Sequence, residues 1–429
     1  MRRNQRRRKE EKDNLKKIIC FLLIIILSMI LFLILKKELF NKVFNKNLHN
    51  SIIESTQSDY NLETETKNSL KIDTEQPIKN NKSTTITMTA LGDSLCHNTQ
   101  YWDAYNKETD EYDFSYVYED IRDYTKYSDI TIGSLETTFA GKERGYSNYP
   151  TFNTPDSLAT ALKKIGVDII SLAGNHALDY GYTGLCRTID VLDNVGISHL
   201  GTYKTAEDQE KILIQNVKGL NIAFINYTYG TNGIPIPSGK DYCVNLIDKN
   251  LIKKQIEQAK SQNVDIIVAC MHWGTEYRTT ANSEQEELAD FLFENGVDII
   301  LGNHPHVLEP MEKKNITLTD GTEKEVFVVY ALGNFTADQR DEITRDSAIL
   351  NLTITKNIDG KITIDKADYV PIYMYKNPNS NLHKFKILDI EKTIQDYDSG
   401  LNTSIGLTTY NNLKKQLDKI KSILGEEIN

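Results

Sequence analysis

The feature that most constrains the fold of this chain is a series of short apolar runs that each lead into a residue able to bind a metal ion. The clearest is Val297-Asp298-Ile299-Ile300, which leads into Leu301-Gly302-Asn303-His304-Pro305-His306. The other runs lead to Asp93, Glu136, Asn175-His176 and His272. Because open α/β folds build their sites at the carboxyl ends of strands, this series predicts strands whose ends meet at one edge.

Segments of helical spacing alternate with these apolar runs. The patterns predict strands over residues 86–91, 129–135, 167–172, 211–217, 221–226, 264–271, 297–301 and 326–332, and helices over 114–127, 155–165, 182–195, 251–262 and 283–295. The helix over 155–165 is expected to begin after an N-cap at Thr154 and to stop at Gly166. Residues 346–375 predict further strands with a turn at Asp359-Gly360. The alternation indicates an α/β layered fold with some antiparallel strands late in the chain.

One pentapeptide occurs twice. Gly-Val-Asp-Ile-Ile stands at residues 166–170 and again at 296–300, and each copy leads to Gly-Asn-His. We interpret the two copies as similar helix-turn-strand units and not as a solenoid repeat.

The pattern of the amino-terminal region predicts a membrane anchor. Residues 1–17 are rich in Arg and Lys, and residues 18–35 form an uninterrupted apolar run that is followed by Lys36-Lys37. This run has the length of a short transmembrane helix. The basic flank places the amino terminus in the cytoplasm, and no small-residue cleavage site follows, so we expect a single-pass cell-membrane protein with its folded domain outside the cell. A buried soluble helix fits the charge asymmetry less well.

The remaining chain divides into a stalk, a domain and a tail. Residues 36–84 are polar without a lasting period and are expected to form a flexible stalk, either as a spacer or as an incidental tether. We expect the folded domain over 85–375 and a helical tail over 376–429. The net charge of −10 argues against a nucleic-acid partner. Cys96, Cys186, Cys243 and Cys270 lack CxxC spacing, which favours free thiols, although a disulfide outside the cell stays open.

The residues at the ends of the apolar runs predict a two-metal centre. The candidate ligands are Asp93, His97, Glu136, Asn175, His272, His304 and His306. Carboxylate, amide and imidazole together suit manganese, iron or zinc. Two such cations about 3.5 to 4 Å apart lower the pKa of a bridging water and neutralise a phosphoryl transition state. His176, next to Asn175, is placed to supply the proton that the leaving group needs.

A lone histidine is more often a hydrogen-bonded core or surface residue than a ligand, and Asp93 or Asn175 could simply be turn residues. Their joint occurrence favours the metal centre, because five of the eight histidines fall in Gly-containing turns at predicted strand ends.

Five motifs together resemble the CapA (PgsA) family of poly-γ-glutamate capsule biosynthesis. They are Leu91-Gly92-Asp93, Gly133-Ser134-Leu135-Glu136, Ala173-Gly174-Asn175-His176, His272-Trp273-Gly274-Thr275-Glu276-Tyr277 and Gly302-Asn303-His304-Pro305-His306. The resemblance covers residues 85–375. The family's domain is similar to calcineurin-like metallophosphoesterases, so the resemblance implies a four-layer α/β/β/α sandwich. The anchor with an external domain also resembles the family's arrangement.

The resemblance implies a role for each candidate residue. Asp93 and His306, with His97 as a third ligand, would serve the first metal; Asn175, His272 and His304 would serve the second; Glu136 would bridge the two; His176 would be the proton donor.

Three positions depart from the phosphoesterase pattern. His97 follows Asp93 by four residues instead of two, and Glu136 replaces an aspartate. The acid that follows Gly-Asn-His is Ala177 here, and Asp179 is expected to orient His176 in its place. Glu276 and Arg278 lie outside the pattern and are expected either to contact substrate or to form a surface ion pair.

These observations predict a membrane-anchored, CapA-type capsule biosynthesis protein with an external metal-dependent phosphoesterase-like hydrolase domain. Its expected partners are the membrane, the membrane subunits of a polyglutamate synthase and an anionic polymer. Two alternatives stay open. The domain could be a non-catalytic metal- or polymer-binding partner of the synthase, or an extracellular phosphatase or nucleotidase unrelated to capsule.

Overall fold

A computed structural model describes residues 83–318, 321–401 and 405–428. The basic tail, the membrane anchor and almost all of the stalk that the sequence predicts lie outside these residues. Within the described ranges, no helix is both long and apolar enough to cross a membrane.

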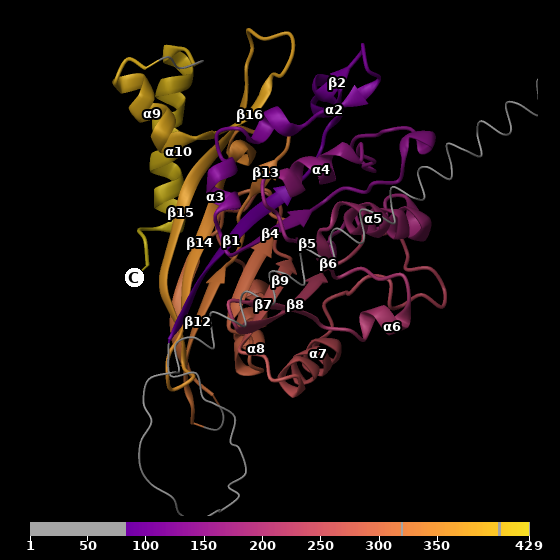
Figure 1. The fold of residues 1–429 in the computed structure, drawn as a ribbon, viewed down its shortest axis with the longest axis vertical. Coiled ribbons are helices and arrows are strands. Elements are labelled where there is room, and N and C mark those ends of the chain that lie inside the picture. Colours follow the sequence, from indigo (N-terminus) through magenta and orange to yellow (C-terminus); the bar gives the residue numbers. More distant parts are fainter. Residues whose placement is uncertain (1–82, 319–320, 402–404, 429) are drawn as a thin grey trace, which may run out of the picture. The chain divides into compact units, whose positions relative to one another are not determined.

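Two β-sheets form the centre of the domain (Figure 1). The first sheet has the order β16-β15-β14-β1-β4-β5-β6, and β13 also pairs with β1. Its strands are β1 (Thr84–Ser94), β4 (Ile130–Leu135), β5 (Ile169–Ser171), β6 (Ser198–Leu200), β13 (Asn334–Thr336), β14 (Asp346–Lys356), β15 (Ile362–Lys376) and β16 (Phe385–Asp389).

The second sheet has the order β11-β12-β10-β9-β8-β7. Its strands are β7 (Leu213–Val217), β8 (Leu220–Thr228), β9 (Ile266–His272), β10 (Ile299–Asn303), β11 (Met311–Thr317) and β12 (Glu323–Val329). Strands β1, β4, β5 and β6 run parallel in the first sheet, and β8, β9, β10 and β12 run parallel in the second.

The sheets pack face to face, because alternate residues of their strands share one buried core. Met88 and Ile132 of the first sheet contribute to this core together with Val268 and Ile299 of the second. The intervening residues point outward, as Ile300 does between Ile299 and Leu301. This period of two is what a strand buried on both faces requires.

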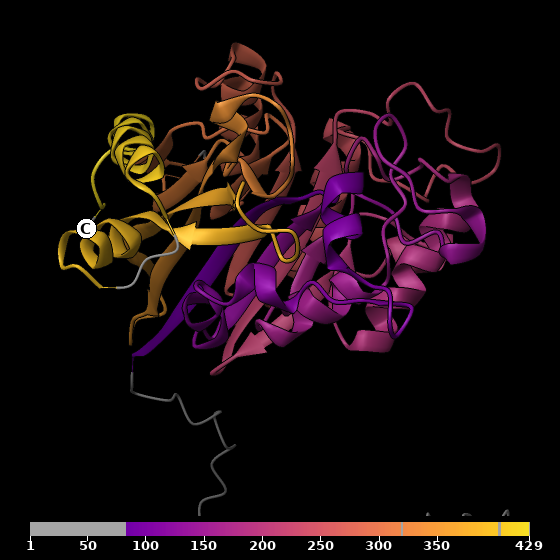
Figure 2. The same ribbon diagram turned by 90° about the horizontal axis from the view of Figure 1, so that it is seen from above.

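Helices cover the outer face of each sheet, which Figures 1 and 2 show from two directions. On the first sheet these are α2 (Asn98–Ala104), α3 (Arg122–Lys126), α4 (Ser157–Lys164) and α5 (Gly181–Val195), with the 3₁₀ turn η1 (Ser115–Tyr118). On the second sheet they are α7 (Lys249–Ser261) and α8 (Ser283–Glu294). The short α6 (Ala206–Gln209), η2 (Lys142–Arg144), η3 (Glu342–Arg345) and the ribbon of β2 (Tyr105–Asn106) and β3 (Glu111–Tyr112) lie in connections. The result is a mixed α/β domain in which two sheets lie between helices.

The structure differs from three sequence predictions. Residues 114–127 form η1 and α3 in place of one helix. The N-cap of α4 is Asp156 and not Thr154, whose hydroxyl lies 2.7 Å from that of Thr137. The expected boundary at residue 375 is wrong, because β16 extends the first sheet. The helices α9 (Ile390–Asp398) and α10 (Leu407–Leu424) also pack on that sheet through Ile390 and Leu413, among others.

The repeated pentapeptide forms two similar units, α4 with β5 and α8 with β10. The glycines at 166 and 296 have φ angles of +99° and +113°, which favour glycine. In the first unit Asp168 accepts a hydrogen bond from the Thr131 amide at 3.0 Å, and in the second Asp298 accepts one from the Ile267 amide at 2.7 Å. Each aspartate thus ties its strand to the neighbouring parallel strand.

Glu309 is a fully buried carboxyl group beside α8. Gln285 Nε2 donates a hydrogen bond to Oε2 at 2.6 Å, and Oε1 has no hydrogen-bond partner. Burial raises the pKa of Glu309 to about 7, against the slight opposing effect of Gln285.

This raised pKa predicts a pH-dependent stability. The unfolded chain loses the Glu309 proton near pH 4.5, whereas the folded chain keeps it to about pH 7. Stability supported by the neutral group is therefore lost between these values as the pH rises. We expect Glu309→Gln to raise the free energy of unfolding by about 3 kcal/mol at pH 8 and to change it little at pH 4. Urea unfolding of both chains at pH 4, 6 and 8 measures this, with the exposed Glu207→Gln as control. Parallel pH profiles for wild type and Glu309→Gln would contradict it.

Candidate metal centre

Buried polar residues from both sheets meet where their parallel strands end. Asp93 lies near the end of β1, Glu136 directly follows β4, and His272 is the last residue of β9. His304 and His306 follow β10, and Asn175 lies in the turn after β5. The sequence predicted this convergence, and each of the six side chains is at most 4% exposed.

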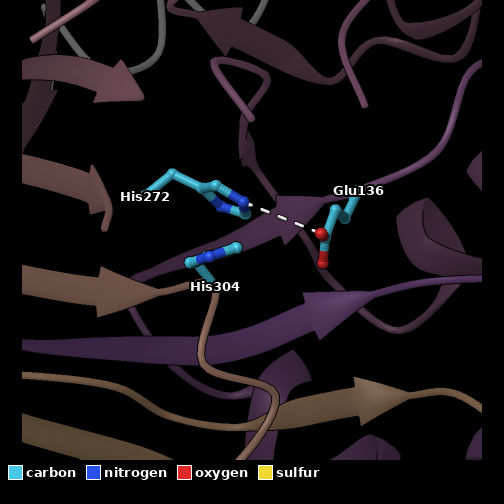
Figure 3. A group of neighbouring side chains, drawn as sticks. All are labelled: Glu136, His272 and His304. Atoms are coloured by element: carbon cyan, nitrogen blue, oxygen red, sulfur yellow. Dashed lines mark ion pairs between the residues drawn. The ribbon is translucent and has the colours of Figure 1, made fainter. Parts of the chain in front are cut away.

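Glu136 is shared by two overlapping groups of ligand-type atoms. One group is Glu136, His272 and His304; the other is Asp93, Glu136 and His306. Within each group the ligand atoms all lie within 4.8 Å of one another. Figure 3 shows the imidazoles of His272 and His304 facing the Glu136 carboxylate, with 3.7 Å between His272 Nε2 and Glu136 Oε1. The other oxygen, Oε2, lies 3.6 Å from His306 Nδ1.

The Glu136 carboxylate is buried without a hydrogen-bond donor. Neither of its oxygens has a hydrogen-bond partner. Burial alone would raise its pKa, but the imidazoles of His306 and His272 outweigh burial and lower it, so the group is ionised. Among the ion pairs of the described residues, its partners are histidines and not lysine or arginine. A buried carboxylate that accepts no hydrogen bond is unfavourable in a protein interior, so this arrangement fits a bound cation between its oxygens and the imidazoles.

Asp93 is fixed by donors from both sheets. Ser134 Oγ donates to Oδ1 at 2.7 Å, and the His304 backbone amide donates to Oδ2 at 2.8 Å. His272 Nδ1 lies 3.9 Å from Oδ1. Burial and the charge of Glu136 raise the pKa of Asp93, because two buried carboxylates repel each other. A cation at this position would relieve that repulsion.

Asn175 presents its amide oxygen to the same centre. Its Oδ1 lies 2.7 Å from His272 Nε2, while its Nδ2 donates to Asn232 Oδ1 at 3.2 Å. The second contact orients the amide, so that the oxygen faces His272.

The turn that carries His304 and His306 has an unusual backbone. The φ angles are +101° at His304 and +62° at His306, in a region that non-glycine residues rarely adopt. A Cβ at Gly302 would lie only 1.8 Å from the Tyr330 carbonyl oxygen, so glycine is required where this turn begins. Burial lowers the pKa of His304, which favours the neutral imidazole that a metal ion requires, and its Nδ1 has no hydrogen-bond partner.

His176 lies beside the centre and is held by Asp179. Its Nδ1 donates to Asp179 Oδ2 at 2.7 Å, and the Phe152 amide donates to the same oxygen at 2.6 Å. Burial by itself would lower the pKa of His176, but Asp179 and Glu136 outweigh burial and raise it. Nε2 lies 3.4 Å from Asn232 Nδ2.

His97 lies outside both groups of ligand-type atoms. Its Nδ1 accepts a hydrogen bond from the Asp338 amide at 3.1 Å, and its ring meets Phe152 edge to face. Burial lowers its pKa.

Glu276 and Arg278 are exposed, in a loop held beside the histidine turn by a hydrogen bond from the Tyr277 amide to the Pro305 carbonyl at 2.8 Å. No ion pair joins Glu276 to Arg278 among the residues described, so the predicted alternative of a surface ion pair is not seen.

Sequence reasoning missed two residues of this region. The half-exposed ring of Tyr229, just after β8, lies with its centroid 4.5 Å from that of His304. Asn334, the first residue of β13, lies with Oδ1 3.0 Å from His306 Nδ1. Asn334 had a signal in the sequence, because it follows a glycine after a strand, as Asn175 and Asn303 do.

Two kinds of comparison relate the chain to known proteins by sequence. Residues 87–339, more than half of the chain, match the family model described as bacterial capsule synthesis protein PGA_cap. The chain is 28% identical over 291 residues to the capsule biosynthesis protein CapA of Bacillus anthracis, covering 66% of this chain and 67% of that one. It is 30% identical over 266 residues to the PGA biosynthesis protein CapA of Bacillus subtilis, covering 61% and 67%.

More distant similarities were also found. A probable polyglutamine synthesis accessory protein of Mycobacterium tuberculosis is 22% identical over 204 residues, covering 43% of this chain and 52% of that one. Among solved structures, Haemophilus influenzae NAD nucleotidase has a TM-score of 0.44 at 15% identity, and the match covers 80% of this chain and 61% of that one. The calcineurin-like phosphoesterase YfkN of Bacillus subtilis has a TM-score of 0.40 at 14% identity, and the match covers 79% of this chain and 98% of that one. The family model and the two Bacillus relatives establish that this chain belongs to the PGA_cap family of bacterial capsule synthesis proteins.

Proposed function

We propose that this chain takes part in poly-γ-glutamate capsule biosynthesis and that its domain is a two-metal phosphoesterase. The names of the two Bacillus relatives support the capsule role. The observation that carries the proposed chemistry is the ionised, buried Glu136 carboxylate, whose two oxygens face different imidazoles and accept no hydrogen bond.

The donor set of the centre fits two divalent cations. Asp93, Glu136 and His306 would hold the first, and Glu136, Asn175, His272 and His304 would hold the second. Oxygen and nitrogen donors without a thiolate suit manganese, iron or zinc. When bound, such a pair polarises a water molecule and neutralises the charge that develops on a phosphoryl group.

The other residues around the centre have distinct proposed roles. His176 donates a proton from Nε2 to the leaving oxygen, while Asp179 holds its Nδ1–H and keeps the ring oriented. The exposed Glu276 and Arg278 border the histidine turn and would contact the part of the substrate that projects from the centre. Tyr229 covers His304 and limits the access of water from that side.

We also propose that residues 18–35 anchor the protein in the cell membrane with the domain outside the cell, where it acts beside the membrane subunits of a polyglutamate synthase. The basic residues before this apolar run and Lys36-Lys37 after it support the orientation. A non-catalytic accessory role is the second candidate, favoured by the name of the Mycobacterium tuberculosis relative.

Cation binding provides the first test of the centre. We expect the full-length chain, purified in detergent and equilibrated with Mn²⁺, to retain two ions per chain when metal content is measured by mass spectrometry. Glu136→Gln should lower Mn²⁺ affinity on the order of 100-fold or more, because both positions lose a shared anionic ligand. The partly exposed Glu312→Gln is the matched control. A wild-type chain without bound metal, or a Glu136→Gln chain with wild-type affinity, would rule out the proposed centre.

Hydrolysis of a phosphodiester with an alkoxide leaving group, which needs a proton in order to depart, tests catalysis by the Mn²⁺-loaded chain. His176→Ala should lower kcat by about 10² to 10⁴-fold without loss of metal, because only the proton donor is removed. Asp179→Asn should have a smaller effect of about 10 to 100-fold. The exposed His383→Ala serves as control and should keep full activity.

The same measurements separate the two candidate functions. A chain that binds two cations but hydrolyses no phosphoester, and whose His176→Ala variant still supports capsule formation in a producing strain, would replace the catalytic proposal with the accessory one. Unchanged kcat in His176→Ala would remove this residue from the reaction.

A further inference from the structure

Asn334 lies beside Asp93 at the metal centre, although the two residues are far apart in the sequence. Strand β13 pairs in parallel with β1, and the register places Asn334 opposite Asp93. The Asp93 amide donates to the Gly333 carbonyl at 2.9 Å. A Cβ at Gly92 would lie 2.1 Å from that carbonyl, so only glycine allows the strands this close. Because paired residues of neighbouring strands project to the same side, the Asn334 and Asp93 side chains enter the centre together.

The amide of Asn334 is oriented by its own hydrogen bonds. Its Nδ2 donates to the Thr344 carbonyl at 3.0 Å and to Gln339 Oε1 at 2.9 Å. Both hydrogens of the amide nitrogen are therefore engaged away from the centre. The side chain is 1% exposed, and its Oδ1 faces His306 Nδ1 at 3.0 Å. That same nitrogen lies 3.6 Å from Glu136 Oε2.

The arrangement at His306 repeats the one at His272. Each oxygen of Glu136 faces an imidazole nitrogen, at 3.7 Å for His272 and 3.6 Å for His306. Each of these nitrogens also faces an amide oxygen, at 2.7 Å from Asn175 and 3.0 Å from Asn334. Donor atoms that share one cation at bond lengths of about 2.0 to 2.2 Å lie about 3 Å apart when their bonds are near right angles. The two amides therefore occupy equivalent places on the two sides of Glu136.

We propose that Asn334 Oδ1 is a ligand of the first cation, with Asp93, Glu136 and His306. This inference rests on the proposed two-metal centre and assigns it a ligand from a strand that contributes none of the predicted ligands. Asn334 takes the place predicted for His97, whose Nδ1 accepts the Asp338 amide hydrogen. With Asn334 and Asn175, each cation would be held by one neutral amide oxygen, by Glu136 and by at least one imidazole.

The competing role for Asn334 is that of a hydrogen-bond acceptor that holds a proton on His306 Nδ1. A crystal structure of the full-length chain loaded with Mn²⁺ separates the two by the anomalous signal of the metal. We expect Asn334 Oδ1 within about 2.5 Å of the first manganese. A manganese more than about 3 Å from Oδ1, bound through His306 Nε2 with Nδ1–H facing Asn334, would overturn the proposal.

Mn²⁺ affinity gives an independent readout. Asn334→Ala should weaken one of the two binding positions about 10 to 100-fold in calorimetric titration and leave the other occupied. The control is Asn351→Ala, which removes an asparagine of β14 that is also hydrogen-bonded on both sides, through Thr89 and Asp368. This control should bind like wild type.

The outcomes of these experiments separate the ligand role of Asn334 from the existence of the two-metal centre. Wild-type affinity at both positions of a folded Asn334→Ala chain would overturn the role of Asn334 alone. Absence of Mn²⁺ from the wild-type chain would overturn the proposed centre and this inference together. Should Asn334→Ala not fold, Asn334→Asp keeps an oxygen ligand and must retain both ions, and loss of one would count against the assignment.

Discussion

The buried carboxylate of Glu136 is the constraint on which the rest of the site depends. A carboxylate that accepts no hydrogen bond is unfavourable in a protein interior, and here only imidazoles, at 3.6 and 3.7 Å, lie close to the Glu136 oxygens as ion-pair partners among the described residues. The neighbouring Asp93 increases the requirement for positive charge, because its own carboxylate is buried and repels Glu136. The proposed pair of divalent cations would satisfy both carboxylates at once. The folded state is therefore expected to depend on metal for part of its stability as well as for its chemistry.

The two-sheet architecture explains how these groups can meet. Each sheet supplies strands that run parallel and end at the same edge, and side chains at those ends face one another across the junction. The hydrogen bond from the His304 amide to Asp93 joins the sheets at this point. The positive φ angles of His304 and His306 show that the turn departs from relaxed backbone geometry, as functional sites in rigid scaffolds often do. Gly92 and Gly302 lack a Cβ that would collide with the carbonyl oxygens of the neighbouring segments, so the backbone at the site can pack this closely.

Membership of the PGA_cap family and the geometry of the centre support different parts of the proposed function. The family relation supports the capsule role, and the donor set supports the proposed metal binding. The polymer named in the capsule proposal is joined by amide bonds, so the two parts do not follow from each other.

The sequence alone predicted most of the residues that meet at the candidate centre, and it predicted the α/β class of the fold. Apolar runs ending in Asp93, Glu136, Asn175, His272 and His304 predicted parallel strands and their shared edge, because strand ends are local features that patterning reveals. Only the tertiary structure decided which of these atoms face one another. In the folded chain His97 Nδ1 accepts a hydrogen bond from the Asp338 backbone amide. Residues beyond 375 also belong to the first sheet, because β16 pairs with β15. The tertiary structure brought in Asn334 through the pairing of β13 with β1, which joins segments about 240 residues apart. The Gly333-Asn334 pattern could have marked Asn334 as a candidate, but the pairing itself depends on packing across the whole domain and leaves no periodic signal in a short strand. The sequence therefore could not show that Asn334 lies beside Asp93.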